Sequence, residues 1–133
     1  MVYDNFSEHR MRLLGHCLSD KMQVFLEHST AIISLSLEDQ ERFKFATGDS
    51  EGFVNYPLSI KGINIAAFFT ERKDKVRISL RSRGNYAVNA ICYKYFAGGG
   101  HTNAAGGESD LSLKETFDKF ISLMPSFTEL MLK

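Results

Sequence analysis

The sequence predicts an α/β (α+β) domain in which a mixed β-sheet of about four to five strands is covered by helices. The chain has 133 residues and is 44% hydrophobic, which suits one domain around one core. Helical and extended patterns alternate along it, and two strand-like segments, "INIAAFFTE" and "KVRISLRS", are separated only by the polar stretch "RKD". An adjacent strand pair among helices favours a mixed sheet with helical layers.

The first third of the chain predicts a helix, two strands and a second helix. Ser7 can cap a helix that runs to about Ser19, with an apolar stripe of Met11, Leu14 and Leu18. "KMQVFLEH" and "TAIISLS" are typical of two short strands. Ser36, followed by Asp39, then marks the start of a helix over 37–45.

The middle of the chain predicts an irregular segment and then the strand pair. "TGDSEGFVNYPLSIKG" is rich in Gly, Asp, Ser and Pro, so we expect a loop or a short helix interrupted near Pro57. The two strands that follow should form a hairpin.

The last third predicts two helices around a glycine-rich segment. Asn85 is expected to cap a helix over 86–96, and Ser112 with Glu115 to form a capping box for the final helix, whose regular part should end near Pro125. Between them lies a loop and a short strand. The apolar stripes of the two helices are Val88, Ile91, Cys92 and Tyr95, and Leu113, Phe117, Phe120, Ile121 and Met124.

Composition narrows the function classes. Lys plus Arg and Asp plus Glu both number 16, so the formal net charge is zero. A large non-specific nucleic-acid footprint would need a basic excess, and any anion site must therefore be local. Cys17 and Cys92 lie far apart in apolar patterns, which indicates reduced, buried thiols rather than a zinc site. With no apolar run long enough to span a membrane, a cytoplasmic protein is expected.

The strand "KVRISLRSR" carries a candidate phosphate-binding face. Alternation sends Val76, Ile78 and Leu80 into the core and Arg77, Ser79 and Arg81 to the other side, joined by Arg83 if the strand continues. On the strand alone, such a row is typical of an ordinary solvated face. The alternative is a phosphate-binding face, because Arg makes bidentate bonds to anionic oxygens and Ser adds a hydroxyl.

The segment "FAGGGHTNAAGG" is the second candidate, with five of the chain's ten glycines around one histidine. Glycine lets a ligand approach the bare backbone, and successive N–H groups can bind an anion. His101 adds a donor. One glycine would suffice for a helix C-cap. The three glycines before a histidine therefore leave two interpretations open, a C-cap followed by a wide turn or a ligand-binding loop. The spacing fits neither a Walker loop nor a Rossmann turn.

These two segments together resemble the DHH-associated C-terminal domain of DHH-family phosphoesterases. "GGGHTNAAGG" is similar to its GGGH motif, and "VRISLRSRGNYAVNAICYKYF" to the segment before it. "EGFVNYPLSIKGINIAAFFTE" resembles most closely the branch of nanoRNases and pAp phosphatases. The resemblance extends roughly from Thr30 to the last helix.

The resemblance implies a two-domain enzyme. An N-terminal DHH domain would hold two metal ions, usually manganese, and the C-terminal domain would close over the cleft and bind a nucleotide or short single-stranded RNA. It implies that Gly98, Gly99, Gly100 and His101 form the loop at the cleft, with His101 reaching the reacting phosphate. Arg81, with Ser79 and Ser82 around it, would contact the substrate. Asn89 matches the asparagine of the helix that enters the loop.

Two departures from the family pattern matter. Ala97 stands where many members have a fourth glycine, and the chain has no DHH triplet or Asp/His set for two metals about 3.5–4 Å apart. We therefore expect this chain to bind no metal or cofactor and to hydrolyse nothing alone. Residues 1–20 would be the connector helix from the DHH domain of the same parent chain, and residues 21–133 the nucleotide-binding domain.

The sequence alone leaves several other functions open. The parent could be a single-strand exonuclease or an exopolyphosphatase-like enzyme, although a long DNA track calls for more basic surface. The chain could also be a stand-alone nucleic-acid-binding module, or a structural domain in which the glycines are a spacer. The natural substrate, the metal and the oligomeric state, including a homodimer, are left open.

Overall fold

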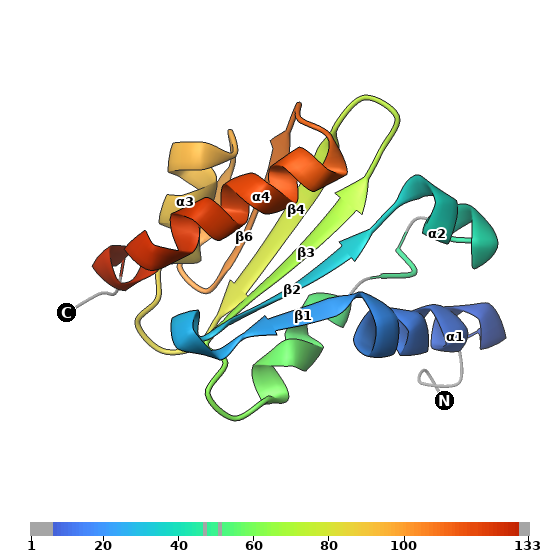
Figure 1. Cartoon of the computed structure of the whole chain (residues 1–133), viewed down its shortest axis with the longest axis horizontal. Coiled ribbons are helices and arrows are strands. Elements are labelled where there is room, and N and C mark those ends of the chain that lie inside the picture. Colours follow the sequence, from blue (N-terminus) through green and yellow to red (C-terminus); the bar gives the residue numbers. More distant parts are fainter. Residues whose placement is uncertain (1–6, 47, 51, 131–133) are drawn as a thin grey trace.

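The computed structural model describes residues 7–46, 48–50 and 52–130, and places a six-stranded mixed sheet between two helical layers (Figure 1). The strand order is β1-β2-β3-β4-β6-β5, in which only β2 and β3 run parallel. The strands are β1 Met22–Phe25, β2 Thr30–Leu35, β3 Ile65–Glu71, β4 Val76–Ser82, β5 Gly99–His101 and β6 Ala104–Ser109. The predicted fold class is confirmed, with a slightly higher strand count.

The α-helices are short, and several continue into irregular turns. The α-helices are α1 Glu8–His16, α2 Leu37–Arg42, α3 Val88–Tyr95 and α4 Leu113–Leu123. The other helical segments are the π-helix η2 Cys17–Lys21 and the 3₁₀-helices η3 Leu26–His28, η4 Phe53–Ser59 and η5 Met124–Leu130. Within the described residues, no helix has the length and apolarity needed to cross a membrane.

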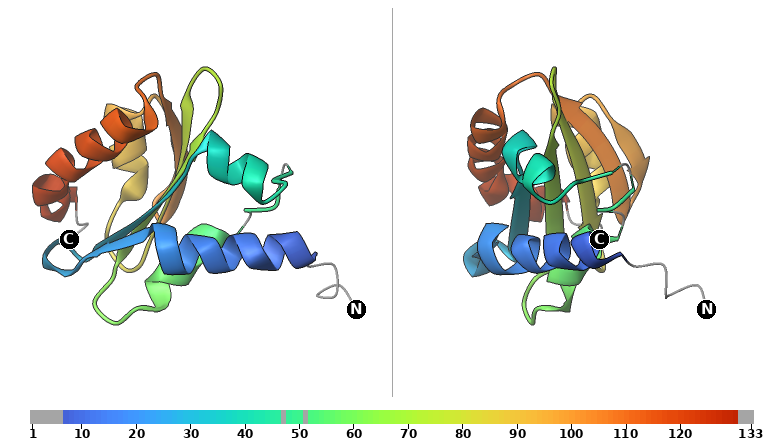
Figure 2. Two further views of the ribbon diagram at one scale, coloured as in Figure 1. Left: turned by 45° about the vertical axis from the view of Figure 1, so that its right-hand side comes forward. Right: turned by 90° about the vertical axis from the view of Figure 1, so that its right-hand side faces the viewer.

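Helices lie on both faces of the sheet (Figure 2), and each face carries its own apolar cluster. One face packs against α3, α4 and η5 through buried residues such as Phe69, Phe96 and Phe120, whose rings meet at 5.3 and 6.2 Å. The opposite face packs against α1 and η4, with Leu13 and Cys17 fully buried. The sheet is therefore covered by helices, as the sequence predicted.

Several predicted helix boundaries are confirmed by their caps. The Ser7 hydroxyl accepts a bond from Arg10 N–H at 3.2 Å, and Ser36 accepts one from Asp39 N–H at 3.1 Å. Ser112 and Glu115 form the predicted capping box. The irregular segment contains a 3₁₀-helix with Pro57 inside it, and the β3–β4 hairpin is present.

Three expectations were wrong in detail. Met11 is 54% exposed, because α1 and η2 turn Leu13 and Cys17 inward instead. The second helix ends at Arg42 rather than at residue 45. Asn85 does not cap α3: the helix begins at Val88, after Ala87, because Val88 N–H bonds the Thr102 carbonyl at 2.9 Å.

The two cysteines are free and buried. Burial raises the pKa of the Cys17 thiol to about 12 and that of Cys92 to about 11. Both thiols therefore stay protonated near neutral pH, in agreement with the predicted reduced pair.

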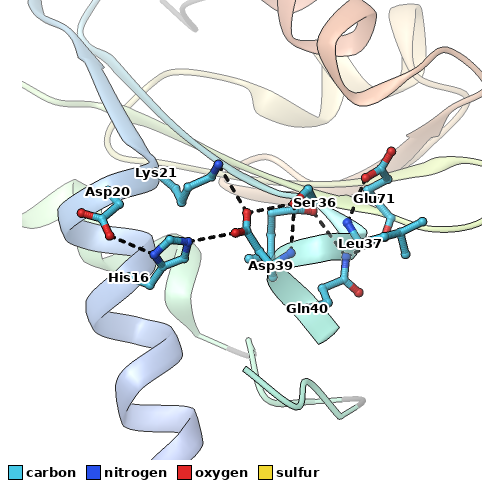
Figure 3. A network of polar contacts seen from close by, with 9 residues as sticks. His16, Asp20, Lys21, Ser36, Leu37, Asp39, Gln40 and Glu71 are labelled. Atoms are coloured by element: carbon cyan, nitrogen blue, oxygen red, sulfur yellow. Dashed lines mark hydrogen bonds and ion pairs between the residues drawn. The ribbon is translucent and has the colours of Figure 1, made fainter. Parts of the chain in front are cut away.

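A polar cluster joins α1 and η2 to α2 (Figure 3). The His16 ring lies between two carboxylates, with Nδ1 2.9 Å from Asp20 and Nε2 3.1 Å from Asp39. Asp39 also accepts a bond from Ser36 Oγ at 3.0 Å and pairs with Lys21 Nζ at 3.3 Å. Partial burial alone would raise the pKa of Asp39, but these bonds outweigh it and hold that pKa below its ordinary value.

The same cluster continues into the sheet through α2. Leu37 N–H donates to the Glu71 carboxylate at 2.9 Å, and the Gln40 amide donates to the Glu71 carbonyl at 2.7 Å. The helix predicted as an interdomain connector is thus fixed to the body of the domain through side chains of α2. Residues 1–6 of that predicted segment lie outside the described residues.

Asp39→Asn should lower the free energy of unfolding by about 1–3 kcal/mol at pH 7, because it removes the shared acceptor of a partly buried cluster. A carboxyl whose pKa is lower in the folded state stabilises above its unfolded pKa, and this stabilisation is lost as pH falls through the folded value. The difference between variant and parent should therefore shrink below about pH 4. Urea unfolding at pH 7 and pH 3 measures it.

Asp118→Asn is the matched control, since Asp118 is exposed and, in the segments that the structure describes, pairs only with Lys114 on its own helix. It should change the unfolding free energy by less than about 0.5 kcal/mol. An Asp39→Asn effect as small as this would show that the cluster contributes no stability.

Ala97→Gly should raise the free energy of unfolding by about 0.5–1 kcal/mol. Ala97 follows α3 with φ +50°, a left-handed conformation that strains a residue with a Cβ and that glycine adopts freely. The same substitution at exposed Ala46, which is not among the residues with positive φ, should be neutral or destabilising. Thermal unfolding of both variants is the measurement; a lower midpoint for Ala97→Gly would contradict this account.

Candidate phosphate-binding face

The strand register brings the predicted arginine strand and the predicted histidine onto one face. Arg81 pairs with Ala104, and Ala104 pairs with His101, so the three residues form one row across β4, β6 and β5. Directly paired residues of antiparallel strands point to the same side. Two strand spacings separate Arg81 from His101, which is about 10 Å between Cα atoms.

A second row runs beside the first and contains almost no side-chain volume. Ser79 pairs with Gly106, which pairs with Gly99. Together with Ala104, the two glycines form a low floor between Ser79 and Arg81 on one side and His101 on the other. A floor this bare leaves room for a ligand to lie against the sheet.

The polar groups at this floor are available for a ligand. Among the described residues, the His101 ring and the Ser79 hydroxyl have no hydrogen-bond partner, and His101 is exposed. Within the described part of the chain, the Arg81 guanidinium bonds only the adjacent Leu80 carbonyl, at 2.9 Å. Each group can therefore donate to an anion without breaking an internal ion pair.

A cavity of about 170 Å³ lies at one end of this floor. Ser79 and Arg81 line it together with Ser50 and Thr70, so three hydroxyls and one guanidinium meet there. Its other lining residues are Gly52, Val54 and Phe68. No carboxylate lines it among the described residues, and this donor set is suited to a phosphate group. We call this cavity with Ala104, Gly106, Gly99 and His101 the phosphate face.

Ser82 lies away from the phosphate face. It pairs with Ile65, on the side of the sheet that α3 and α4 cover, and is buried. Its hydroxyl donates to the Tyr86 carbonyl at 2.6 Å and accepts from the Asn103 amide at 2.8 Å. The strand ends at Ser82, so Arg83 does not extend the row.

The glycine segment is an edge hairpin rather than an open loop. Close backbone contacts require glycine at positions 98 and 107. A Cβ on Gly98 would overlap the Gly106 carbonyl, and one on Gly107 would lie 2.6 Å from the Phe96 carbonyl oxygen. Gly100 has φ +142°, and a Cβ there would lie 2.8 Å from the Ala104 oxygen. Gly99 has no atom within 4 Å of its hypothetical Cβ, so the fold does not require glycine at this position.

Asn89 borders a different cavity, of about 350 Å³, at the outer edge of β5. Its lining residues are Asn89, Ala90, Tyr93, Gly99 and Gly100. The predicted site residues therefore divide into two groups on either side of β5, one at the phosphate face and one at the cavity beside Asn89. Sequence reasoning did not single out Ser50, Thr70 or Asn103; the first two are brought to Ser79 only by the tertiary fold.

The described residues contain no group of three His, Cys, Asp or Glu side chains that could hold a metal ion. The resemblance assigns the two manganese ions to a DHH domain and not to this segment, and that assignment stays a prediction. What this segment offers is the donor set of an anion-binding surface.

These features define a mixed α+β domain whose β4–β6–β5 edge carries a surface suited to an anion. Comparison with known proteins shows the family to which the chain belongs. The family model described as the DHHA1 domain matches residues 29–129, so the chain belongs to that family. The DHHA1 domain is the DHH-associated domain of the phosphoesterases that the sequence resembled, and that resemblance is confirmed.

Similar proteins are nucleotide hydrolases by name. The chain is 32% identical over 77 residues to the bifunctional oligoribonuclease and PAP phosphatase NrnA of Thermus thermophilus, covering 57% of this chain and 24% of that protein. It is 37% identical over 81 residues to a 3′,5′-cyclic-nucleotide phosphodiesterase of Helicobacter pylori, covering 53% of this chain and 22% of that protein. The chain thus spans about a quarter of these relatives.

A solved structure matches nearly the whole chain. An exopolyphosphatase-related protein from Bacteroides fragilis superposes with a TM-score of 0.92 at 42% identity, covering 97% of this chain and 38% of that one. The match includes residues before the DHHA1 family segment, and the corresponding protein is more than twice as long.

Gly99→Ala and Gly106→Ala should change the free energy of unfolding by less than about 1 kcal/mol, because neither added methyl meets a closer contact than 3.5 Å. Gly98→Ala and Gly107→Ala should each cost about 1–3 kcal/mol or more, because the methyl overlaps backbone atoms. Urea unfolding of the four variants measures this. Equal losses at Gly99 and Gly98 would mean that the glycine run is required throughout for folding alone.

Proposed function

We propose that this chain is the nucleotide-binding domain of a DHH-type phosphoesterase that hydrolyses short oligoribonucleotides or pAp-like nucleotides. The observation that carries the proposal is the placement of Ser79, Arg81 and His101 on one face, around a floor of Ala and Gly and beside a cavity rich in hydroxyls. Membership of the DHHA1 family and the names of the similar hydrolases support it.

In this proposal Arg81 and Ser79 hold a phosphate of the substrate. The guanidinium supplies positive charge and two parallel hydrogen-bond donors. The hydroxyls of Ser79, Thr70 and Ser50 add neutral donors to the same cavity. His101 lies across the floor, where it can donate to a neighbouring phosphate oxygen or to the leaving oxygen. Hydrolysis itself would require a preceding DHH domain of the same parent chain, in which we place the two manganese ions.

The zero net charge fits a short substrate. A protein that tracks a long single strand neutralises many phosphates with Lys and Arg, whereas the phosphate face contributes a few donors at one place. We therefore favour a mononucleotide or short oligonucleotide over a long DNA strand.

Arg81→Ala should weaken binding of adenosine 3′,5′-bisphosphate by about 10- to 150-fold, because a hydrogen bond to a charged group contributes about 1.5–3 kcal/mol. Arg12→Ala, at an exposed arginine on α1 outside the cavity, is the matched control and should bind as the parent does. Isothermal titration of the three proteins, with their unfolding curves, measures this. Equal affinity of the Arg81 variant and the parent would exclude the phosphate face as the site.

A further inference from the structure

We propose that the cavity at the outer edge of β5 binds the base of the nucleotide whose phosphate occupies the phosphate face. This base recess is formed by Asn89, Ala90, Tyr93, Gly99 and Gly100 and measures about 350 Å³. The inference rests on the proposed function and adds to it a second, aromatic subsite on the other side of the glycine strand.

Tyr93 supplies the stacking surface of the recess. Its side chain is 81% exposed, more than any other large apolar side chain among the described residues. Asn89 and Tyr93 are four residues apart on α3 and therefore lie on one face of the helix, away from the buried stripe of Val88, Ile91 and Cys92. An exposed aromatic ring beside a cavity is the element on which nucleobases stack, whatever their sequence.

The recess also contains polar groups suited to the edge of a base. The Asn89 side chain is partly buried and makes no hydrogen bond within the described residues. Its amide offers both a donor and an acceptor, as base edges require.

The backbone of Gly100 adds a second donor and acceptor. Ser82 N–H donates to the Asn103 carbonyl at 3.0 Å and Glu108 N–H to the Phe96 carbonyl at 2.8 Å. Bonds in an antiparallel ladder alternate in direction, so Ala104 and Gly106 bond toward β5 and Ala105 toward β4. Gly100, opposite Ala105, therefore directs its N–H and C=O away from β6 and toward the open edge.

The recess and the phosphate face meet at Gly99. This residue belongs to the floor of the phosphate face through its pairing with Gly106, and it also lines the recess. Nothing in the fold requires glycine there, since a Cβ would have open space. A nucleotide that crosses β5 at Gly99 would keep its phosphate on the sheet face and its base against Tyr93.

A base fits the edge better than an added β-strand does. β5 has three residues, which is at the lower limit for a strand, and Tyr93 and Asn89 stand beside its open edge. A flat ring that needs one stacking surface and a few polar groups matches this geometry.

The test is amide and side-chain NMR of the full 133-residue chain, titrated separately with adenosine, inorganic phosphate and adenosine 3′,5′-bisphosphate. Adenosine should shift signals of Asn89, Tyr93 and Gly100, inorganic phosphate those of Ser79 and Arg81, and the bisphosphate both sets. Tyr93→Ala should weaken adenosine binding at least about fivefold, whereas Tyr93→Phe should retain it, since the ring does the stacking.

Tyr56→Ala, at a tyrosine of η4 that is 47% exposed and outside the recess, controls for loss of any surface tyrosine and should leave adenosine binding unchanged. Phosphate shifts without adenosine shifts in the recess would overturn this inference and leave the proposed function standing. Adenosine shifts in the recess without phosphate shifts would contradict the proposed function instead. An unchanged adenosine affinity in Tyr93→Ala would also overturn the recess.

Discussion

The backbone contact between the end of α3 and β6 is the constraint on which the candidate site depends. Gly98 passes against the Gly106 carbonyl, and Gly107 lies against Phe96, at distances that leave no space for a Cβ. This approach fixes β5 as the edge strand beside β6. It thereby sets the register that aligns His101 with Ala104 and Arg81. A side chain at Gly98 or Gly107 would force this backbone contact to shift.

The two faces of the sheet differ in how far helices cover them. The α3 and α4 face is filled by Phe side chains and holds the fold together. On the other face, α1 and η4 pack mainly against β2 and β3, through residues such as Ile33 and Phe68, and η4 also reaches β4. The β4–β6–β5 side of that face keeps Arg77, Gly106 and His101 exposed. The candidate phosphate face therefore lies where the second helical layer leaves the sheet exposed.

The polar cluster around Asp39 links the first helix to the same structural unit. It ties α1 to α2, and α2 to the end of β3 through Glu71. β3 is the neighbour of β4, which carries Ser79 and Arg81. A chain of bonded side chains thus leads from the N-terminal helix to the strand beside β4.

The sequence by itself determined the fold class, most caps, the hairpin and the family, because these depend on local hydrogen bonds, side-chain periodicity and a distinctive motif. It also paired Ser79 with Arg81 by simple alternation along a strand. Only the tertiary structure decided that Ser82 points to the core side, that Ser50 and Thr70 join the cavity, and that Asn89 borders a separate recess. These facts depend on strand register and on which element lies beside another, and no local pattern encodes contacts between segments so far apart in the chain.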